Sequence, residues 1–184
     1  AGHGSYTAGK RTPKMLVDID FEGDGIIDVY AGQQIKEHVA NVGVSKYLSS
    51  ALKRCGFAVY ESAFGDEDIS LSNRQKNIKN EKCNYSVSIH FNASGNGTSF
   101  NSGQGVSIYK HKTANKEKSS AKFAATVLRE MIQGTPQKNR GVLQAGFAMC
   151  DTSKMGTEAS ILVETAFMTN ENEAVNMMGS AAFW

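Results

Sequence analysis

The 184-residue sequence is poor in proline, cysteine and long apolar runs, and it carries little net charge. It has no apolar run of the roughly 18 residues that a membrane-spanning helix needs, so we expect no membrane insertion. No charged segment followed by an apolar one opens the chain, so the sequence predicts no signal peptide. The net charge of +2 is too small to favour nucleic acid as a partner.

The cysteines are too few and too widely spaced to indicate a metal site or a disulfide framework. Cys55, Cys83 and Cys150 form no C-x-x-C pair, and their number is odd. We expect them to behave as small buried side chains in a reducing compartment.

Short apolar runs alternate with helical patterns, with no internal repeat or long linker, which predicts a single domain over residues 1–184. Strands are predicted at 57–60, 85–91, 105–109 and 160–167, and helices at 70–82 and 114–133. Nearly continuous apolar strands that alternate with helices are typical of an α/β fold. In such folds a largely parallel sheet carries helices on both faces.

A further helix is predicted in "QIKEHVANVGVSKYLSSALKRCGF", ending before Gly56. Glu37 shares a face of this helix with Val44 and Leu48, which we expect to be buried. A carboxylate on a buried face is costly unless it is paired or ligates a metal. The alternative is an ordinary first-turn glutamate that the helix dipole stabilises.

Three other polar side chains stand where a purely structural role fits poorly. His3 lies between two glycines, which let the backbone bring its side chain close to other groups. His90 comes near the end of the apolar stretch "YSVSIHFNA", and Glu164 follows the apolar "ILV". Two histidines and a carboxylate are a common ligand set for catalytic zinc, with a second carboxylate as base. Sequence spacing alone does not show that these residues converge.

Five motifs in order along the chain together resemble the zinc-dependent N-acetylmuramoyl-L-alanine amidases, the group of AmiC-type cell-wall amidases and many phage endolysins. They are "GHG" (2–4), Glu37 with Asn41, "SIHFNA" (88–93), "NRG" (139–141) and "VETAFMTN" (163–170). The resemblance implies a phosphorylase/hydrolase-like α/β fold with a mixed, mostly parallel twisted sheet. It also implies hydrolysis of the amide bond between N-acetylmuramic acid and the L-alanine of the peptidoglycan stem peptide.

The resemblance implies a role for each residue that matches the family's motifs. His3, Glu37 and His90 would bind one Zn²⁺ per chain. Glu164 would be the catalytic base, taking a proton from water and passing it to the departing L-alanine nitrogen.

Two residues outside this set are predicted to contact the substrate. Asn92 would hydrogen-bond the substrate or orient the site. Arg140 would either meet a carboxylate of the stem peptide or only neutralise a surface, and the sequence leaves both readings open.

Two other functions use the same residues. A zinc peptidase that cuts within the stem peptide needs the same metal and base, and a non-catalytic wall-binding relative would keep the fold. The intact set of four residues argues against the second. We expect a monomer that acts on the bacterial cell wall, either as the catalytic domain of a phage or prophage endolysin released at lysis or as a secreted enzyme.

An acidic insertion at about 14–34 precedes Glu37, where the family often has a shorter link. Its "DFEGDGIIDVYA" (20–31) resembles an EF-hand loop, but Ala31 stands where a bidentate glutamate belongs. We therefore favour an acidic turn between short strands at 15–19 and 25–30 over a calcium site. The residues that would bind calcium are Asp20, Glu22, Asp24 and Asp28.

Overall fold

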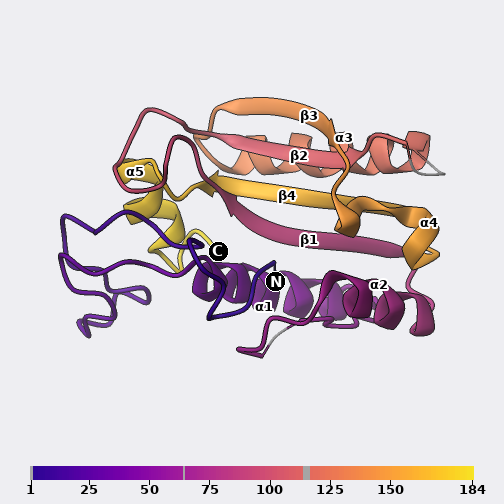
Figure 1. The fold of residues 1–184 in the computed structure, drawn as a ribbon, viewed down its shortest axis with the longest axis horizontal. Coiled ribbons are helices and arrows are strands. Elements are labelled where there is room, and N and C mark those ends of the chain that lie inside the picture. The colour runs from indigo at the N-terminus through magenta and orange to yellow at the C-terminus, as the bar shows by residue number, and fades with distance from the viewer. Residues whose placement is uncertain (1, 64, 114–116) are drawn as a thin grey trace.

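The computed structural model describes residues 2–63, 65–113 and 117–184. Within these residues a four-stranded sheet has the order β1-β4-β2-β3 (Figure 1). The strands are β1 (Tyr85–Asn92), β2 (Val106–His111), β3 (Asn139–Ala145) and β4 (Ala159–Phe167). β1 is parallel to β4, β2 is parallel to β3, and β2 is antiparallel to β4. The prediction of a mixed, mostly parallel sheet is confirmed.

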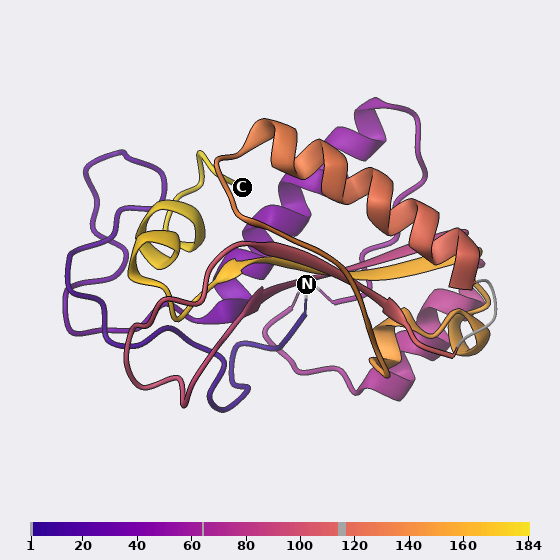
Figure 2. The same ribbon diagram turned by 90° about the horizontal axis from the view of Figure 1, so that it is seen from above.

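The helices lie on both faces of the sheet (Figures 1 and 2). They are α1 (Glu37–Arg54), α2 (Leu71–Asn80), α3 (Glu117–Gly134), α4 (Thr152–Met155) and α5 (Glu171–Glu173), with two short helical turns at Ala148–Cys150 and Ala174–Met178. α3 packs against β2, β3 and β4, whereas α2 and α4 lie on the opposite side, and α1 contacts β1. In the described part of the chain no helix is both long and apolar enough to cross a membrane.

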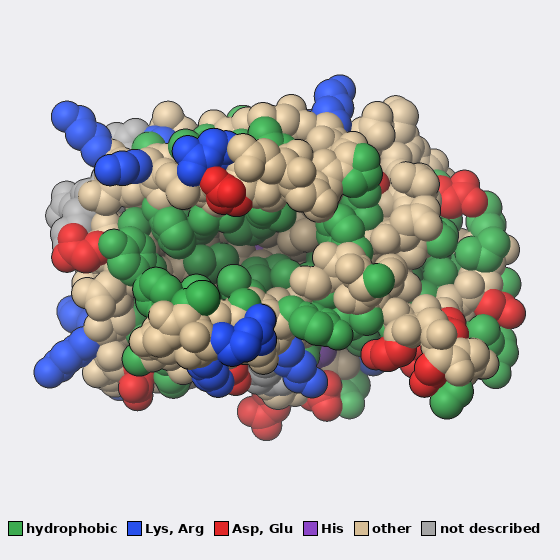
Figure 3. All heavy atoms as spheres, turned by 180° about the vertical axis from the view of Figure 1, so that it is seen from behind, with side chains coloured by type: hydrophobic (Ala, Val, Ile, Leu, Met, Phe, Trp, Pro, Cys, Tyr) green, Lys and Arg blue, Asp and Glu red, His purple; other side chains and the backbone are tan. Residues whose placement is uncertain are grey.

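The two faces of the sheet differ in character because side chains alternate along each strand. On the α3 face, Ile161 and Val163 of β4 form a core with Ala124 and Leu128 of α3. Seen from behind, hydrophobic side chains gather around a hollow in the middle of the molecule (Figure 3). The alternate positions of β1 and β4, among them His90 and Glu164, belong to the other face.

The acidic insertion packs at one end of the molecule, beside α5 and the carboxyl-terminal residues (Figures 1 and 2). The two sides of the insertion meet at a single antiparallel bridge between Ile19 and Val29 rather than in two full strands. Phe21 contacts the ring of Trp184, with 5.4 Å between ring centroids. Ile19 and Met15 join the same buried cluster as Phe91, so the insertion is part of the core.

Several predictions of local structure are wrong, among them the strands at 15–19 and 25–30, which reduce to one bridge, and the burial of Cys55, which is exposed. Residues 57–60 form no strand, and Phe57 is 59% exposed, because they have no neighbouring strand to complete a ladder. Leu48 is exposed rather than buried, since α1 turns small and polar side chains inward and packs Gly43 against Trp184. The edge strand β3 was not predicted because it is polar and is interrupted by Gly141.

Helices α1, α2 and α3 agree with the sequence prediction. Ser70 caps α2 by accepting a hydrogen bond from the Asn73 backbone N–H, and Gly56 follows α1 with a φ of +85°. The first three residues predicted for the helix at 114–133 lie outside the described residues; from Glu117 onward the helix is present.

Candidate active site

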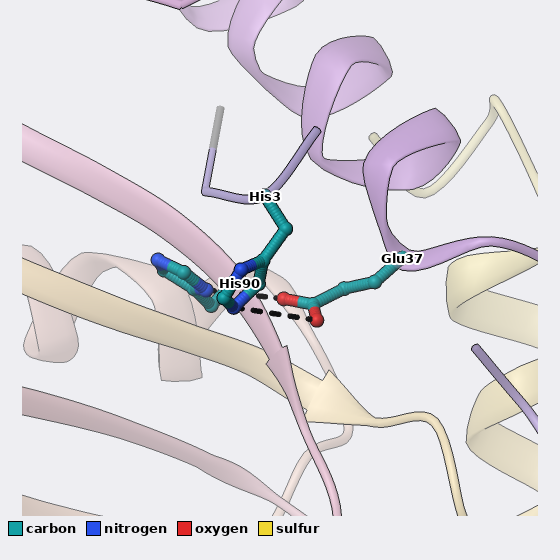
Figure 4. A group of neighbouring side chains, drawn as sticks. All are labelled: His3, Glu37 and His90. Atoms are coloured by element: carbon teal, nitrogen blue, oxygen red, sulfur yellow. Dashed lines mark hydrogen bonds and ion pairs between the residues drawn. The ribbon is translucent and has the colours of Figure 1, made fainter. Parts of the chain in front are cut away.

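His3, Glu37 and His90 converge, although 34 and 53 residues separate them in sequence. They come from the amino-terminal segment, the first turn of α1 and strand β1, and their side chains point toward one another (Figure 4). One ligand atom from each lies within 4.8 Å of the other two. The predicted convergence is therefore present in the structure.

The Glu37 carboxylate is held by one oxygen and leaves the other without a hydrogen-bond partner. Oε1 accepts hydrogen bonds from the backbone N–H of Phe91 at 3.2 Å and from Asn41 Nδ2 at 3.2 Å, and it lies 3.1 Å from His90 Nδ1. Oε2 has no hydrogen-bond partner in the described part of the chain, and the residue is only 1% exposed. His3 Nε2 lies 3.9 Å from Oε2.

An unsatisfied buried carboxylate oxygen costs free energy, so its presence calls for an explanation. A metal ion is one, because zinc is bound by histidine nitrogens and carboxylate oxygens at about 2.0–2.2 Å. Tetrahedral ligands at that distance lie about 3.4 Å apart, so these three need to close by about 1.5 Å at most. The residues fit a zinc ion in number, chemical type and separation.

Local packing explains why glycines flank His3. A Cβ atom on Gly2 would lie 2.2 Å from His90 Cε1, and a Cβ on Gly4 would lie 2.6 Å from the Asp68 backbone nitrogen. Any side chain at either position would therefore collide with the site or with its support. This is the close approach that the "GHG" motif predicted.

The electrostatics of the cluster suit metal binding at neutral pH. Burial lowers the pKa of His3 to about 4, so its imidazole is neutral and has a lone pair for a cation. Burial opposes ionisation of Glu37, but the hydrogen bond from His90 and the electrostatic attraction of that residue hold the pKa of Glu37 below its usual value. A neutral imidazole and an ionised carboxylate are the ligand forms that zinc requires.

Glu164 lies directly beside His90, since the two residues are register partners in the parallel pair β1–β4. Its Oε2 is buried and has no hydrogen-bond partner among the described residues. Burial, followed by repulsion from Glu37, raises the pKa of Glu164 to about 8. A carboxyl group with so high a pKa, next to a metal-type cluster, is typical of a general acid or base.

Sequence analysis missed three residues that support the cluster. Ser88 Oγ lies 3.1 Å from His90 Nε2, His38 Nδ1 lies 2.5 Å from the backbone oxygen of His3, and Arg74 Nη1 donates to the backbone oxygen of Gly2. His38 is not part of the ligand cluster. The alternation of β1 placed Ser88 on the same face as His90 and could have identified it.

The structure leaves the roles of Asn92 and Arg140 as predictions. Asn92 Oδ1 accepts a hydrogen bond from the backbone N–H of Ala93 at 2.7 Å. The Arg140 guanidinium lies 5.0 Å from the ring centroid of Phe167 and donates to the Gln104 backbone oxygen at 3.3 Å. These contacts show how each side chain is held and do not involve the His–Glu–His cluster.

Asp20, Glu22 and Asp28 of the acidic insertion also bring one oxygen each within 4.8 Å of one another; Asp24 is outside this group. The Asp20 carboxylate accepts from the backbone N–H groups of Gly23, Gly25 and Asp24 at 2.6, 2.7 and 3.2 Å. These bonds are those of a closed acidic turn, and the calcium site stays a prediction.

Comparison with known proteins finds a similar curated sequence. N-acetylmuramoyl-L-alanine amidase LytC of Bacillus subtilis (strain 168) is 28% identical over 143 residues, which are 78% of this chain and 27% of LytC. The chain thus spans about a quarter of that relative's length.

Solved structures share the fold. The catalytic domain of CwlV, an N-acetylmuramoyl-L-alanine amidase from Bacillus (Paenibacillus) polymyxa var. colistinus, has a TM-score of 0.64 at 25% identity, covering 76% of this chain and 72% of that one. An N-acetylmuramoyl-L-alanine amidase from Clostridium difficile 630 has a TM-score of 0.66 at 23% identity, covering 89% and 84%. The sequence profile of the N-acetylmuramoyl-L-alanine amidase family matches residues 1–182, and the chain therefore belongs to this family.

Proposed function

We propose that the chain is a zinc-dependent peptidoglycan hydrolase that cleaves the amide bond between N-acetylmuramic acid and L-alanine of the stem peptide. Family membership supports the reaction class. The observation that carries the metal-dependent mechanism is the buried Oε2 of Glu37, which has no hydrogen-bond partner among the described residues. Glu37 clusters with His3 and His90, and Glu164 is the register partner of His90.

His3, Glu37 and His90 would hold the zinc ion, leaving a fourth position for water or substrate. When bound, zinc lowers the pKa of a coordinated water and polarises a carbonyl group. The protein's part is to fix the three ligands: Asn41 and the Phe91 backbone orient Glu37, and Ser88 orients His90. Ligands held in this way keep their geometry when the substrate enters.

Glu164 would move the protons of the reaction. As a carboxylate it accepts a proton from the attacking water, and as a carboxylic acid it donates that proton to the departing L-alanine nitrogen. Its burial and raised pKa, about 8, place both forms within reach near neutral pH. A glutamate of ordinary pKa would be a weaker acid catalyst for the second step.

The natural substrate would be peptidoglycan, and the site of action would be the bacterial cell wall. Asn92 and Arg140 are the proposed contacts for the glycan and stem peptide. Phage or prophage origin, the monomeric state and calcium binding stay predictions.

The deciding experiment is digestion of purified peptidoglycan by the zinc-loaded protein, with mass spectrometry of the products. The proposal expects new L-alanine amino termini and intact glycan strands. New amino termini within the stem peptide would indicate a peptidase instead, and new reducing sugars would indicate a glycosidase. Binding to peptidoglycan without release of any fragment would point to a non-catalytic wall-binding relative.

A further inference from the structure

The three residues of the cluster are supported in very different ways. Glu37 lies on an 18-residue helix and His90 on an eight-residue strand, both packed against the rest of the fold. His3 lies on residues 2–7, which we call the amino-terminal arm and which form neither helix nor strand. A ligand on such a segment needs other contacts to hold it in place, since ordering free backbone costs about 1–2 kcal/mol per residue.

Arg74 of α2 supplies the first of these contacts. Its side chain is 2% exposed, and its guanidinium donates to the backbone oxygen of Gly2 through Nη1. Nε donates to the Ile69 backbone oxygen at 2.8 Å, and Nη2 lies 3.1 Å from Asp68 Oδ1. A buried guanidinium needs several acceptors, and here the arm provides one of them.

His38 supplies the second contact, on the neighbouring carbonyl group. Its side chain is 7% exposed, and Nδ1 lies 2.5 Å from the backbone oxygen of His3. Because that oxygen can only accept, Nδ1 carries the proton and donates it. Nε2 faces Asp66, 3.8 Å from Oδ1, and the Asp66 backbone oxygen accepts from the Ser5 N–H at 3.0 Å.

The far end of the arm is tied to the same loop. Thr7 Oγ1 donates to Asp68 Oδ2 at 2.6 Å, so Asp68 joins the arm to Arg74. All these contacts engage backbone groups or side chains other than the His3 imidazole. Both ring nitrogens of His3 therefore stay free of these supports.

We propose that Arg74 and His38 are positioning residues that clamp two consecutive carbonyl groups, those of Gly2 and His3, and so hold His3 ready for the metal. The proposal rests on the metal site proposed above. In most metal sites the ligand histidine is oriented through its second ring nitrogen. Here the support acts on the backbone, because the ligand lies on a segment without secondary structure.

The test measures two properties of purified protein: hydrogen exchange of the arm amides with zinc removed, and zinc affinity by competition with a chromogenic chelator. Arg74→Met removes the first carbonyl contact and His38→Leu removes the second. His38→Asn is the conservative variant, since its amide nitrogen can take the place of Nδ1. Arg129→Gln is the matched control, because Arg129 is exposed and its guanidinium pairs with the neighbouring Glu130.

We expect Arg74→Met and His38→Leu each to raise the zinc dissociation constant by about 10–100-fold. Arm exchange should be faster by roughly tenfold or more. His38→Asn should restore most of both properties, and Arg129→Gln should change neither. Thermal unfolding identifies variants that fail to fold; if Arg74→Met is one, the two His38 variants decide the outcome.

Folded variants with unchanged zinc affinity would overturn the proposal, even if the arm exchanges faster, because the clamp would then have no role in metal binding. Unchanged arm exchange would overturn it as well. A separate result bears on the proposed function: if the unmodified protein binds no zinc, the metal site fails. The exchange measurement still reports in that case whether the two residues hold the arm.

Discussion

In the described part of the chain, two groups of side chains have a spacing that suits a metal ion, one of histidines and a glutamate and one of carboxylates alone. They differ in the hydrogen bonds that their carboxylate oxygens already accept. In the acidic insertion, Asp20 is half-buried, and its carboxylate accepts backbone hydrogen bonds through both oxygens. In the His3–Glu37–His90 cluster, one buried oxygen of Glu37 has no hydrogen-bond partner among residues 2–63, 65–113 and 117–184. The two groups therefore share a spacing that suits a metal ion. The Glu37 carboxylate has a buried oxygen without a hydrogen-bond partner in the described part of the chain, whereas both oxygens of Asp20 accept hydrogen bonds.

The difference shows how to separate a structural carboxylate from a ligand. A carboxylate that organises a turn gains its stability from the backbone and needs nothing further. A buried carboxylate with an unpaired oxygen is destabilising by itself, and a bound cation would remove that cost. The predictions below test this difference between the Glu37 and Asp20 carboxylates.

The largest effect is expected from Glu37→Gln. The amide oxygen must occupy the position of Oε1, which accepts from Phe91 and Asn41, so the amide nitrogen faces His3 and offers no lone pair. Zinc affinity should fall on the order of 10³-fold, since a ligand of the ion is lost. Chelator competition measures it, with Asp20→Asn as the control; an equal loss in Asp20→Asn would remove the contrast.

Glu164→Gln should lower hydrolysis of purified peptidoglycan by roughly 10²–10⁴-fold, the usual contribution of a general base. Zinc content should stay near one ion per chain, because Glu164 is not among the three clustered ligands. Fragment release and elemental analysis on the same preparation measure both. Activity close to that of the unmodified protein would show that another group moves the protons.

The same substitution should change how the stability of the zinc-free protein depends on pH. Burial raises the pKa of Glu164 from 4.5 to about 8, so the folded state loses stability as pH rises from 4.5 to 8. Glu164→Gln removes this loss and should be more stable than the unmodified protein by about 5 kcal/mol above pH 8. At pH 4 the two should be equal. Urea unfolding at four pH values measures the difference, and a pH-independent difference would contradict the raised pKa.

A smaller effect is expected from Asp20→Ala. The variant loses the acceptor for three backbone N–H groups of the acidic turn, and we expect the melting temperature to fall by about 2–5 °C. Zinc affinity should not change. Calorimetry measures the melting temperature and chelator competition measures the zinc affinity. A large loss of zinc affinity would mean that the acidic turn and the His3–Glu37–His90 cluster are coupled.

The smallest effect is expected from calcium. Added to 1 mM, it should shift the melting temperature of the zinc-loaded protein by less than about 1 °C, because Asp20 already bonds to the backbone through both oxygens. A calcium-dependent rise that Asp28→Asn abolishes would instead establish the EF-hand-like loop as a binding site.

Much of the sheet could be predicted from sequence, and the reasons are local. The run that forms β4 is a nearly continuous apolar segment, and the run that forms β1 alternates apolar with polar residues; both patterns indicate strands. β3 has no such run, and it pairs only with β2 at the edge of the sheet. The stretch at 57–60 has strand-like composition but no partner, and pairing is a property of the whole fold.

The sequence could identify the residues of the candidate site but could not show that they lie close together. Glu37 and Glu164 stood out because each is a charge within an apolar pattern. Their convergence with His3 depended on family resemblance, since periodicity carries no long-range information. Arg74 and His38 were beyond sequence reasoning, because both act on backbone carbonyl groups that leave no pattern in the residues they hold.

The register pairing of His90 with Glu164 bears on how this site tolerates change over evolution. Adjacent strands lie about 4.8 Å apart, so the backbone ladder itself sets the separation between the proposed ligand and the proposed base. One residue inserted into either strand ahead of the pair would turn one of the two side chains to the opposite face. Insertions such as residues 14–34 enter through loops and leave that separation intact. Proteins of this fold can therefore vary in their loops, whereas an insertion or deletion in β1 ahead of His90 must be matched by one in β4 ahead of Glu164.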